Sequence, residues 1–329
     1  MRKNFIILVN VFFVSVILIA CGDSTSGSDN ESKDKNVNYP EKPIELVIPY
    51  SAGGQTDIAA RILAEYLQDY LDNDVKVVNQ EGSGGAVAIN EVVTANSDGY
   101  KILLHHDAMH VSNVMGQINE SYEDLTPIDA SAEVEQTFVV SADSPWENLD
   151  DFVEDAKENS DEYIFAADIG ATTHFMGEML AQEAGIELKM QDTGDESERM
   201  SSLLGGHSDI AATSLGNAID YEESGDFKIL AVLSENLGDE YSDLKTAKEQ
   251  GYDVVFPVRN VLYGPADLPQ EVIDVWDDVT KKIVEDDNYQ EEIEDAEFVH
   301  KEDLTSEETT EFVKEKYNLM NEIAENIEN

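Results

Sequence analysis

The sequence has 329 residues, 41% of them hydrophobic, which is enough for two domains of ordinary size with apolar cores. Its 20 Lys and Arg residues stand against 71 Asp and Glu residues, so the formal net charge is −51 at pH 7. That charge excludes nucleic acid as a partner, because binding to phosphates needs a basic surface. The single cysteine excludes an internal disulfide or a cysteine-based metal cluster.

The N-terminus predicts a cleaved signal peptide over residues 1–20. Arg2 and Lys3 precede a long apolar run that contains no acidic residue. The run ends at Leu-Ile-Ala-Cys21-Gly, which resembles a bacterial lipobox, in which Cys21 becomes the lipidated first residue. A retained membrane-spanning anchor is the alternative, and the short apolar stretch disfavours it. Residues 21–38 are polar and predict a flexible tether between a membrane and the folded part of the chain.

The surplus of carboxylates is spread along the whole chain and indicates a surface adapted to high salt. At about 1 M ionic strength the Debye length is about 3 Å, so self-repulsion that would strain the fold in dilute buffer is screened. A dedicated cation-binding surface is the alternative. The sequence lacks the clustered ligand spacing, such as an EF-hand loop, that this alternative needs.

Residues 44–48 predict a buried strand, and a glycine turn and a helix follow it at once. Gly53 and Gly54 permit backbone angles and close approaches that a side chain would forbid, and Thr56 or Asp57 can cap the helix. A helix N-terminus just beyond a strand is a common position for anions in α/β folds. An ordinary connection that binds nothing is the alternative at this point.

Strand and helix patterns then alternate, which predicts an α/β fold with largely parallel sheets. Further strands are expected at residues 75–79, 101–105, 136–140, 163–167, 187–191, 209–213, 228–234 and 253–258. Helices are expected at residues 86–95, 175–184, 196–204, 241–250, 271–285 and 306–325. Another helix is expected to start at Ser144, where a capping-box pattern has proline at the first helical position.

Two short motifs have only part of a catalytic or cofactor-binding pattern. The segment Gly82-Ser-Gly-Gly85 lacks the third glycine of a dinucleotide fingerprint and the lysine of a phosphate loop. The segment His106-Asp-Ala-Met-His110, preceded by His105, has zinc-protease spacing with aspartate in place of glutamate. Three uses stay open for these histidines: a catalytic metal, a ligand-contacting loop, or solvated loop side chains.

The turn at residues 168–174 repeats the strand, small-residue turn and helix of the first unit. Asp168 and His174 are a conceivable proton-transfer pair, although hydrogen bonding to backbone or ligand is a simpler use for both. Nucleophilic roles for Ser51, Ser83 or Ser214 lack support, because no G-x-S-x-G elbow surrounds any of these serines.

Several segments together resemble the extracytoplasmic solute-binding proteins of tripartite tricarboxylate transporters. The resemblance covers nearly all of the mature chain, at residues 39–57 with Arg61, 81–85, 98–100, 170–174, 204–209, 228–232 and 264–269. It implies a type II, two-lobed periplasmic-binding-protein-like α/β fold (Venus flytrap) with a mostly parallel sheet in each lobe. Residues 39–135 and 257–329 are expected to form the first lobe, and residues 136–256 the second.

The resemblance also implies where a small organic carboxylate binds between the lobes, without a cofactor, a metal or catalysis. The ligand-binding residues expected from it are Ser51, Ala52, Gly53, Gly54, Thr56 and Asp57 in the first lobe, and Gly170, Ala171, Thr172, Thr173 and His174 in the second. His106 is a further ligand-contacting candidate and Arg259 a candidate counter-ion, whereas Arg61 is expected to pack within the first lobe. Many members carry a Tyr-Lys/Arg-Gly type turn where this chain has residues 192–197, so a basic or aromatic contact is missing.

The function expected from this resemblance is capture of the carboxylate and its delivery to membrane subunits of such a transporter. The protein is expected to be a monomer, held on the outer face of the cell membrane by lipid on Cys21. Two alternatives stay open. One is a lipid-anchored secreted hydrolase acting on a carboxylic ester or amide, and the other is a ligand-sensing partner of a membrane receptor.

Overall fold

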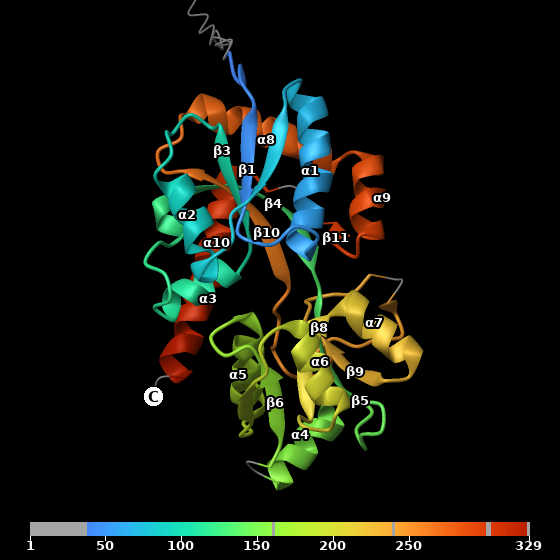
Figure 1. The fold of residues 1–329 in the computed structure, drawn as a ribbon. Helices are drawn as coiled ribbons and strands as arrows, with labels where there is room; N and C mark the ends of the chain where they lie inside the picture. Colours follow the sequence, from blue (N-terminus) through green and yellow to red (C-terminus); the bar gives the residue numbers. More distant parts are fainter. Residues whose placement is uncertain (1–37, 160–161, 239–240, 301–303, 328–329) are drawn as a thin grey trace, which may run out of the picture. The chain divides into compact units, whose positions relative to one another are not determined.

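The computed structural model describes residues 38–159, 162–238, 241–300 and 304–327. Its first sheet has six strands in the order β11-β4-β10-β3-β1-β2 (Figure 1). The strands are β1 (Ile44–Ile48), β2 (Val75–Asn79), β3 (Lys101–His105), β4 (Leu125–Val134), β10 (Val258–Pro265) and β11 (Val299–His300). The helices in this part are α1 (Gln55–Leu71), α2 (Ala86–Val93), α3 (Ala108–Val114), α8 (Gln270–Val284), α9 (Asp287–Asp295) and α10 (Ser306–Ile327).

Both faces of this sheet are apolar because helices cover each of them. Successive side chains of a strand point to opposite faces. Leu46 of β1 accordingly belongs to a core that includes Trp276 of α8. Its neighbour Val47 belongs to a separate core that includes Val313 of α10. All four side chains are fully buried.

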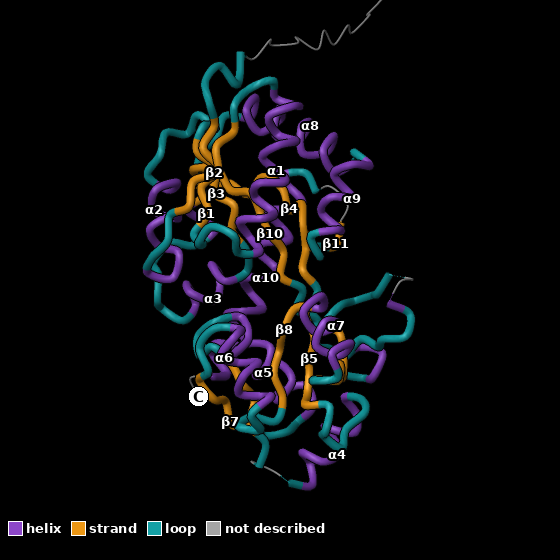
Figure 2. The backbone as a smooth tube through the Cα atoms, turned by 45° about the vertical axis from the view of Figure 1, so that its right-hand side comes forward, coloured by secondary structure: helices purple, strands orange, loops and turns teal. Residues whose placement is uncertain are grey.

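The second sheet has five strands in the order β7-β6-β8-β5-β9 (Figure 2). The strands are β5 (Gln136–Ser141), β6 (Ile164–Ala167), β7 (Lys189–Asp192), β8 (Ile210–Ser214) and β9 (Phe227–Val232). Its helices are α4 (Leu149–Glu158), α5 (Thr172–Ala184), α6 (Glu196–Leu204) and α7 (Leu215–Ser224). Phe138 and Val139 of β5 point into different cores, so this sheet is also buried on both faces.

The two sheets follow one topological plan, and we call the part around the six-stranded sheet lobe 1 and the part around the five-stranded sheet lobe 2. The strand orders β2-β1-β3-β10-β4 and β7-β6-β8-β5-β9 each place an antiparallel strand fourth. That strand is the one by which the chain enters the sheet from the other lobe. Four of the six strands and four of the five run in one direction. The predicted two-lobed α/β class with mostly parallel sheets is therefore confirmed.

The chain passes between the lobes in extended conformation twice, after β4 and before β10. Helix α10 makes a third connection. Its first half contributes Val313 to a core of lobe 1, whereas Met320 and Ile323 are buried in the main core of lobe 2. Near its end, Asn326 Nδ2 donates to Gln182 Oε1 of α5 over 3.2 Å. The C-terminal half of α10 thus packs on lobe 2, although its sequence was assigned to lobe 1.

Several elements differ from the sequence-based expectation. Helix α4 begins at Leu149 and not at Ser144, because Asn148 supplies the cap by accepting from the Asp151 N–H. The predicted strand at 253–258 is instead the approach to β10, and within the predicted helix at 241–250 the structure has a 3₁₀ turn at Lys248–Gln250. The structure adds elements that were not predicted: β4, β10, β11, α3, α7 and α9.

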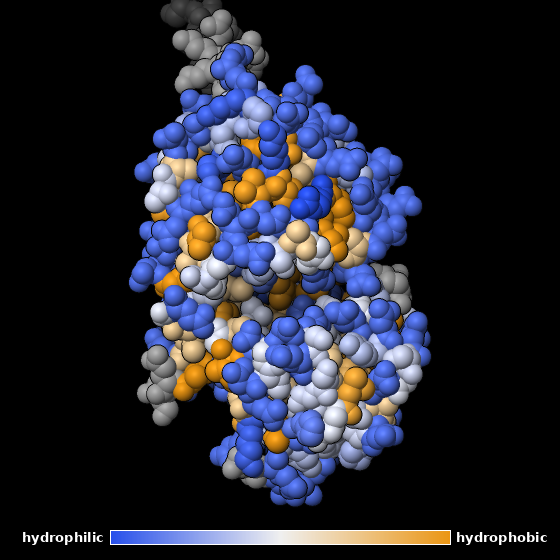
Figure 3. Space-filling model, viewed as in Figure 1, coloured by the Kyte–Doolittle hydropathy of each residue, from blue (hydrophilic) through white to orange (hydrophobic). Residues whose placement is uncertain are grey.

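The N-terminal predictions lie outside the described residues. The signal peptide, Cys21 and residues 21–37 of the tether therefore stay predictions. In the part of the chain that the structure describes, no helix combines the length and the apolar character needed to cross a membrane. The face shown in Figure 3 is mostly hydrophilic, and its surface is hollowed where the two lobes meet.

Candidate functional site

The first glycine turn lies between β1 and α1. Gly53 has a φ of +85°, which favours glycine, and Gly54 is the N-cap of α1 without a side chain that could accept from the helix N–H groups. Ser51 and Ala52 are exposed, whereas Thr56 is buried in the first turn of the helix. The turn therefore presents backbone and one hydroxyl to its surroundings.

Asp57 braces this turn from inside the helix. Its Oδ2 accepts from the Gly53 N–H over 2.8 Å and from Arg61 Nε over 2.8 Å. Its Oδ1 accepts from Arg61 Nη2 over 2.9 Å and from Asn79 Nδ2 over 3.0 Å. The Arg61 hydrogen bonds are the main reason that the pKa of Asp57 is lowered to about 2. Four hydrogen bonds thus satisfy the Asp57 oxygens and fix the turn to the first turn of α1. The exposed Arg61 side chain makes these contacts within lobe 1.

The second glycine turn, at residues 168–174, is built in the same way in lobe 2. Gly170 has a φ of +84°, and Ala171 is the N-cap of α5, again without a side-chain cap. Side chains of the first helical turn hold the backbone: Thr173 Oγ1 accepts from the Asp168 N–H over 3.0 Å, and His174 Nδ1 accepts from the Gly170 N–H over 3.3 Å. Thr173 and His174 are buried, so both act as supports beneath the turn.

The N-termini of α1 and α5 lack a side-chain cap, whereas those of α6 and α7 in lobe 2 have one. Helices α6 and α7 also start just after strands of the second sheet, and Asp195 and Ser214 cap them by accepting from backbone N–H groups. At α1 and α5 the caps are Gly54 and Ala171, which offer no acceptor. The first N–H groups of a helix have no partner within it, and they carry a partial positive charge. Each lobe thus places an uncapped helix N-terminus at the carboxyl edge of its sheet, and in lobe 1 helices α2 and α3, which follow β2 and β3, also start without a side-chain cap.

The histidine segment lies at the same edge of lobe 1, at the end of β3. The rings of His106 and Tyr50 stack with centroids 5.0 Å apart and an interplanar angle of 5°. His105 Nδ1 accepts from the His106 N–H over 2.8 Å, so the proton of the neutral ring is on Nε2. Among the described residues this buried Nε2 has no hydrogen-bond partner, and it lies 3.0 Å from where a Cβ on Gly85 would be. His105 is a polar group that the sequence had left without a role.

Two of the three histidines, His105 and His110, are buried, whereas His106 is partly exposed. His105 is 1% exposed, and His110 of α3 is 2% exposed and packs edge-on against Tyr122 and against Tyr317 of α10. Burial lowers the pKa of His110 to about 3 and that of His106 to about 4. Within the described ranges, no cluster of His, Cys, Asp and Glu is arranged to hold a metal ion.

Arg259 lies at the start of β10 and is buried. Its Nε donates to the Ala130 carbonyl of β4 over 3.0 Å, and its guanidinium carbon is 5.1 Å from the Phe312 ring centroid. Its backbone N–H donates to the Asp107 carboxylate over 3.2 Å, next to the histidine segment. Burial lowers the pKa of Arg259. The contacts hold its side chain beside the strand that crosses between the lobes.

Arg199 is a buried arginine that the sequence reasoning missed. It supports residues 192–197 of lobe 2, where the basic or aromatic contact of many family members is absent. Arg199 of α6 donates from Nε to the Ala212 carbonyl over 3.0 Å and from Nη1 to the Gly194 carbonyl over 3.4 Å. Asp168, at the second glycine turn, has a raised pKa because it is partly buried and near Asp192. The arginine appears in the sequence only as one charged position of an amphipathic helix, so no local motif marked it.

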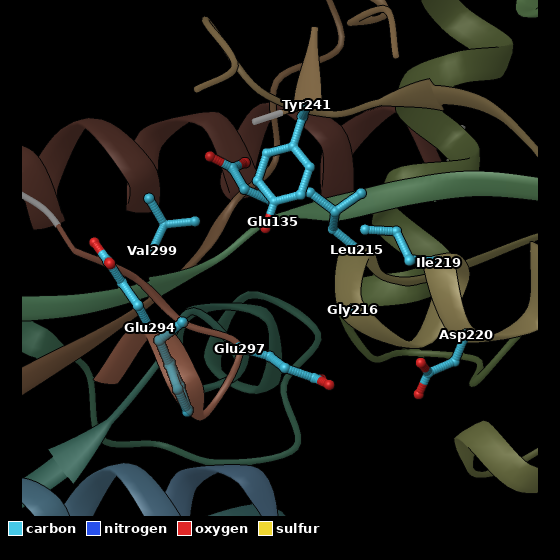
Figure 4. Close-up of a pocket in the computed structure, with 10 residues that line it drawn as sticks. Glu135, Leu215, Gly216, Ile219, Asp220, Tyr241, Glu294, Glu297 and Val299 are labelled. Atoms are coloured by element: carbon cyan, nitrogen blue, oxygen red, sulfur yellow. The ribbon is translucent and has the colours of Figure 1, made fainter. Parts of the chain in front are cut away.

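A pocket of about 570 Å³ lies between the lobes but away from both glycine turns (Figure 4). Its lining includes four carboxylates and the Tyr241 ring, and none of its residues belongs to residues 51–57 or 168–174. The carboxylate residues are Glu135, Asp220, Glu294 and Glu297. An anion would meet like charges here, so the pocket does not fit the carboxylate expected for this protein.

Two lobes of one plan, each with an open helix N-terminus at the carboxyl edge of its sheet, define a receptor that binds a small solute. Residues 59–328 match the family described as "Tripartite tricarboxylate transporter family receptor". The chain belongs to this family, which confirms the resemblance seen in the sequence. It is an extracytoplasmic solute-binding receptor.

Known relatives agree over most of the chain. A UPF0065 protein of Cupriavidus necator is 30% identical over 257 residues, which cover 78% of each chain. The crystal structure of a TctC solute-binding protein from Polaromonas is similar with a TM-score of 0.78 and 25% identity, over 88% of this chain and 99% of that one. The periplasmic binding protein BugD gives a TM-score of 0.69 and 29% identity, over 88% of this chain and 98% of the other.

Proposed function

We propose that the protein captures a small organic carboxylate between its two glycine turns and delivers it to the membrane subunits of a tripartite tricarboxylate-type transporter. The observation that carries this proposal is the pair of uncapped helix N-termini, α1 in lobe 1 and α5 in lobe 2. Each helix end stabilises a negative charge by roughly 0.3–2 kcal/mol. The hydroxyl groups of Ser51 and Thr172 add donors beside these ends.

Similar folds support a carboxylate as the ligand class. A Rhodopseudomonas palustris protein with adipate has a TM-score of 0.73 and 20% identity to this chain. Another protein of that organism, with bound malate, has a TM-score of 0.69 and 18% identity. At such identities the likeness concerns the fold, so the ligand of this chain is a proposal that depends on its own two turns.

Local donors explain how a protein of charge −51 can bind an anion. Neither turn contains lysine or arginine, so backbone N–H groups, hydroxyl groups and ordered water make the contacts. The long-range repulsion is screened at high salt. Arg259 is the proposed counter-ion, acting from the strand crossing, and His106 contributes its stacked ring to the wall of the site.

The lobes are proposed to close on the ligand by bending at the two crossings, near residues 135 and 257. Lobe 1 is assigned residues 39–135 and 257–329, and lobe 2 residues 136–256, with the C-terminal half of α10 packed on lobe 2 as described. Because the ligand contacts both turns only in the closed form, binding shifts the population toward closure. The closed surface is what the transporter subunits recognise. Closure by itself requires no catalytic step.

The protein is proposed to act as a monomeric lipoprotein held on the outer face of the cell membrane through Cys21. The prediction is that a Cys21→Ser variant leaves the membrane fraction and appears in soluble form, whereas the parent chain carries the mass of a lipid on its N-terminal cysteine. A parent chain without lipid would refute the anchor and leave the binding site untouched.

The function is tested by mass spectrometry of small molecules released from the natively purified protein in high salt. The proposal expects a stoichiometric carboxylate, and calorimetric titration should then confirm 1:1 binding that weakens in Arg259→Ala. Unchanged affinity in that variant would remove Arg259 from the site. Turnover of an added ester or amide, without stoichiometric binding, would favour a hydrolase.

A further inference from the structure

Gln117 joins the two lobes at the glycine turns. It lies in the turn after α3, and α3 is close to the start of α5 in both ribbon views (Figures 1 and 2). Its side-chain Nε2 donates to the Gly170 carbonyl of the second glycine turn over 3.3 Å. This hydrogen bond crosses from lobe 1 to the turn proposed to hold the ligand in lobe 2.

The backbone of Gln117 is fixed within lobe 1. Its N–H donates to the Ser112 carbonyl over 2.8 Å, and the next residue, Ile118, donates to the same carbonyl over 3.2 Å. Ile118 is 5% exposed and belongs to a core of lobe 1. The amide of Gln117 is therefore presented from a rigid base, although the side chain itself is on the surface.

The Gln117 amide lies between two glycines, and Gly170 leaves the room that it needs. A Cβ on Gly170 would lie 2.6 Å from Gln117 Nε2, which is closer than real contacts allow. A Cβ on Gly84 would lie 3.7 Å from Gln117 Oε1, so the other end of the amide faces the glycine segment 82–85 of lobe 1. The amide thus fills the space between one glycine segment of lobe 1 and the ligand turn of lobe 2.

We propose that Gln117 is a positioning residue that sets how closely the two ligand turns approach, and through this spacing the length of carboxylate that the closed protein retains. The inference rests on the proposed function for the ligand, but the contact itself does not. The Gln117 hydrogen bond engages the Gly170 carbonyl and not the uncapped N–H groups of α5, so it holds the second turn without occupying the donors proposed for the ligand. A fixed separation of the α1 and α5 N-termini selects an anion whose carboxylates span it.

The test uses Gln117→Ala and Gln117→Glu, with Ser112→Ala as the matched control. Ser112 also lies near Gly84, with Oγ 3.8 Å from the Cβ position, and its side chain makes no hydrogen bond to the described residues of lobe 2. Spin labels are placed at Asp69 of α1 and Glu154 of α4, both exposed, as D69C and E154C in a Cys21→Ser background. The label distance reports closure with and without ligand, and stopped-flow fluorescence reports binding rates for unbranched dicarboxylates from malonate to suberate.

In the parent protein we expect a short label distance and one preferred chain length. In Gln117→Ala the distance lengthens, dissociation is roughly three- to ten-fold faster with little change in association, and the chain-length preference broadens, since one interlobe hydrogen bond is lost. In Gln117→Glu the effect is larger, because a carboxylate faces the Gly170 carbonyl. Ser112→Ala should behave as the parent.

The outcomes separate the two proposals. If the parent binds dicarboxylates and neither Gln117 variant changes label distance or dissociation, the role of Gln117 is refuted and the proposed function stands. If the parent binds none but Gln117→Ala still lengthens the distance, the contact is upheld as an interlobe link and the ligand class is refuted. If neither binding nor distance responds, both are refuted.

Discussion

Asp57 is the residue on which the geometry of the first glycine turn depends, because it joins Gly53, Arg61 and Asn79. The Asp57→Asn variant loses the negative charge that pairs with the Arg61 guanidinium. It also loses one of the two oxygen atoms that accept these hydrogen bonds. We expect the free energy of unfolding to fall by roughly 1–3 kcal/mol and ligand affinity to fall with it. Urea unfolding and calorimetry measure the two effects, and Asp69→Asn, exposed on the same helix, is the control. Unchanged ligand affinity in Asp57→Asn would show that the turn keeps its geometry without the Asp57 carboxylate.

His110 should make stability depend on pH. Its pKa is about 3 in the folded protein because it is buried, against 6.5 for the ordinary side chain. The unfolded chain therefore binds the proton more readily, so the stability contributed by neutral His110 is present above pH 6.5 and is lost as pH falls toward 3. The measurement is the difference in unfolding free energy between parent and His110→Phe across this range, which cancels the effect of the many carboxylates. A constant difference would contradict the burial of His110.

At the residue scale, the sequence marked the two glycine turns but not the contacts that each side chain makes within them. Gly53, Gly54, Gly170 and Ala171 were marked because small residues between a strand and a helix are visible in a linear pattern. The brace at Asp57 involves Asn79, and in the second turn His174 accepts from the Gly170 N–H and Thr173 from the Asp168 N–H, and these pairings exist only after folding. Gln117 was not marked at all, because its partner Gly170 is 53 residues away and in the other lobe.

At the scale of elements, the N-terminus of α5 offers a change that should separate stability from binding. Ala171 has extended backbone angles (φ −113°, ψ −178°), which suit an N-cap. Ala171→Asp adds an acceptor for the open N–H groups, so we expect the protein to gain about 0.5–2 kcal/mol of stability. The same carboxylate occupies the proposed anion position, so ligand affinity should be lost.

The control for this change is Asp195→Ala at α6, which removes a cap that accepts from the Glu198 N–H over 3.0 Å. It should lower stability and leave affinity unchanged. Thermal unfolding and calorimetry on both variants decide the matter, and retained affinity in Ala171→Asp would place the ligand elsewhere.

Elements with a clean apolar pattern were predicted and the others were missed. Strands β1, β2 and β3 are short apolar runs, and their expected bounds agree with the structure. Strand β4 was missed because it contains Pro127, Asp129 and Glu133, although both acidic side chains are buried in the folded protein. Burial of charge beside β10 is a tertiary effect that no local pattern reports.

At the scale of the whole molecule, the charge of −51 predicts a strong dependence on salt. We expect the melting temperature to rise between dilute buffer and molar potassium chloride, because the Debye length shrinks from about 30 Å at 0.01 M to about 3 Å at 1 M. Sucrose at matched osmolality is the control, since it favours burial without screening charge. A melting temperature unchanged by the chloride salt would refute the salt-adapted surface.

The position of β10 between β3 and β4 also decides the order in which a nascent chain can fold. The second sheet uses a continuous stretch, from Gln136 to Val232, so its strands can pair once that stretch has been synthesised. The first sheet has a gap at its centre until residues 258–265 arrive. Non-local pairing of this kind is slow, because the loop between the partners must close first. Lobe 1 therefore begins the chain but completes its sheet after lobe 2, and α10, which needs the cores of both lobes, docks last.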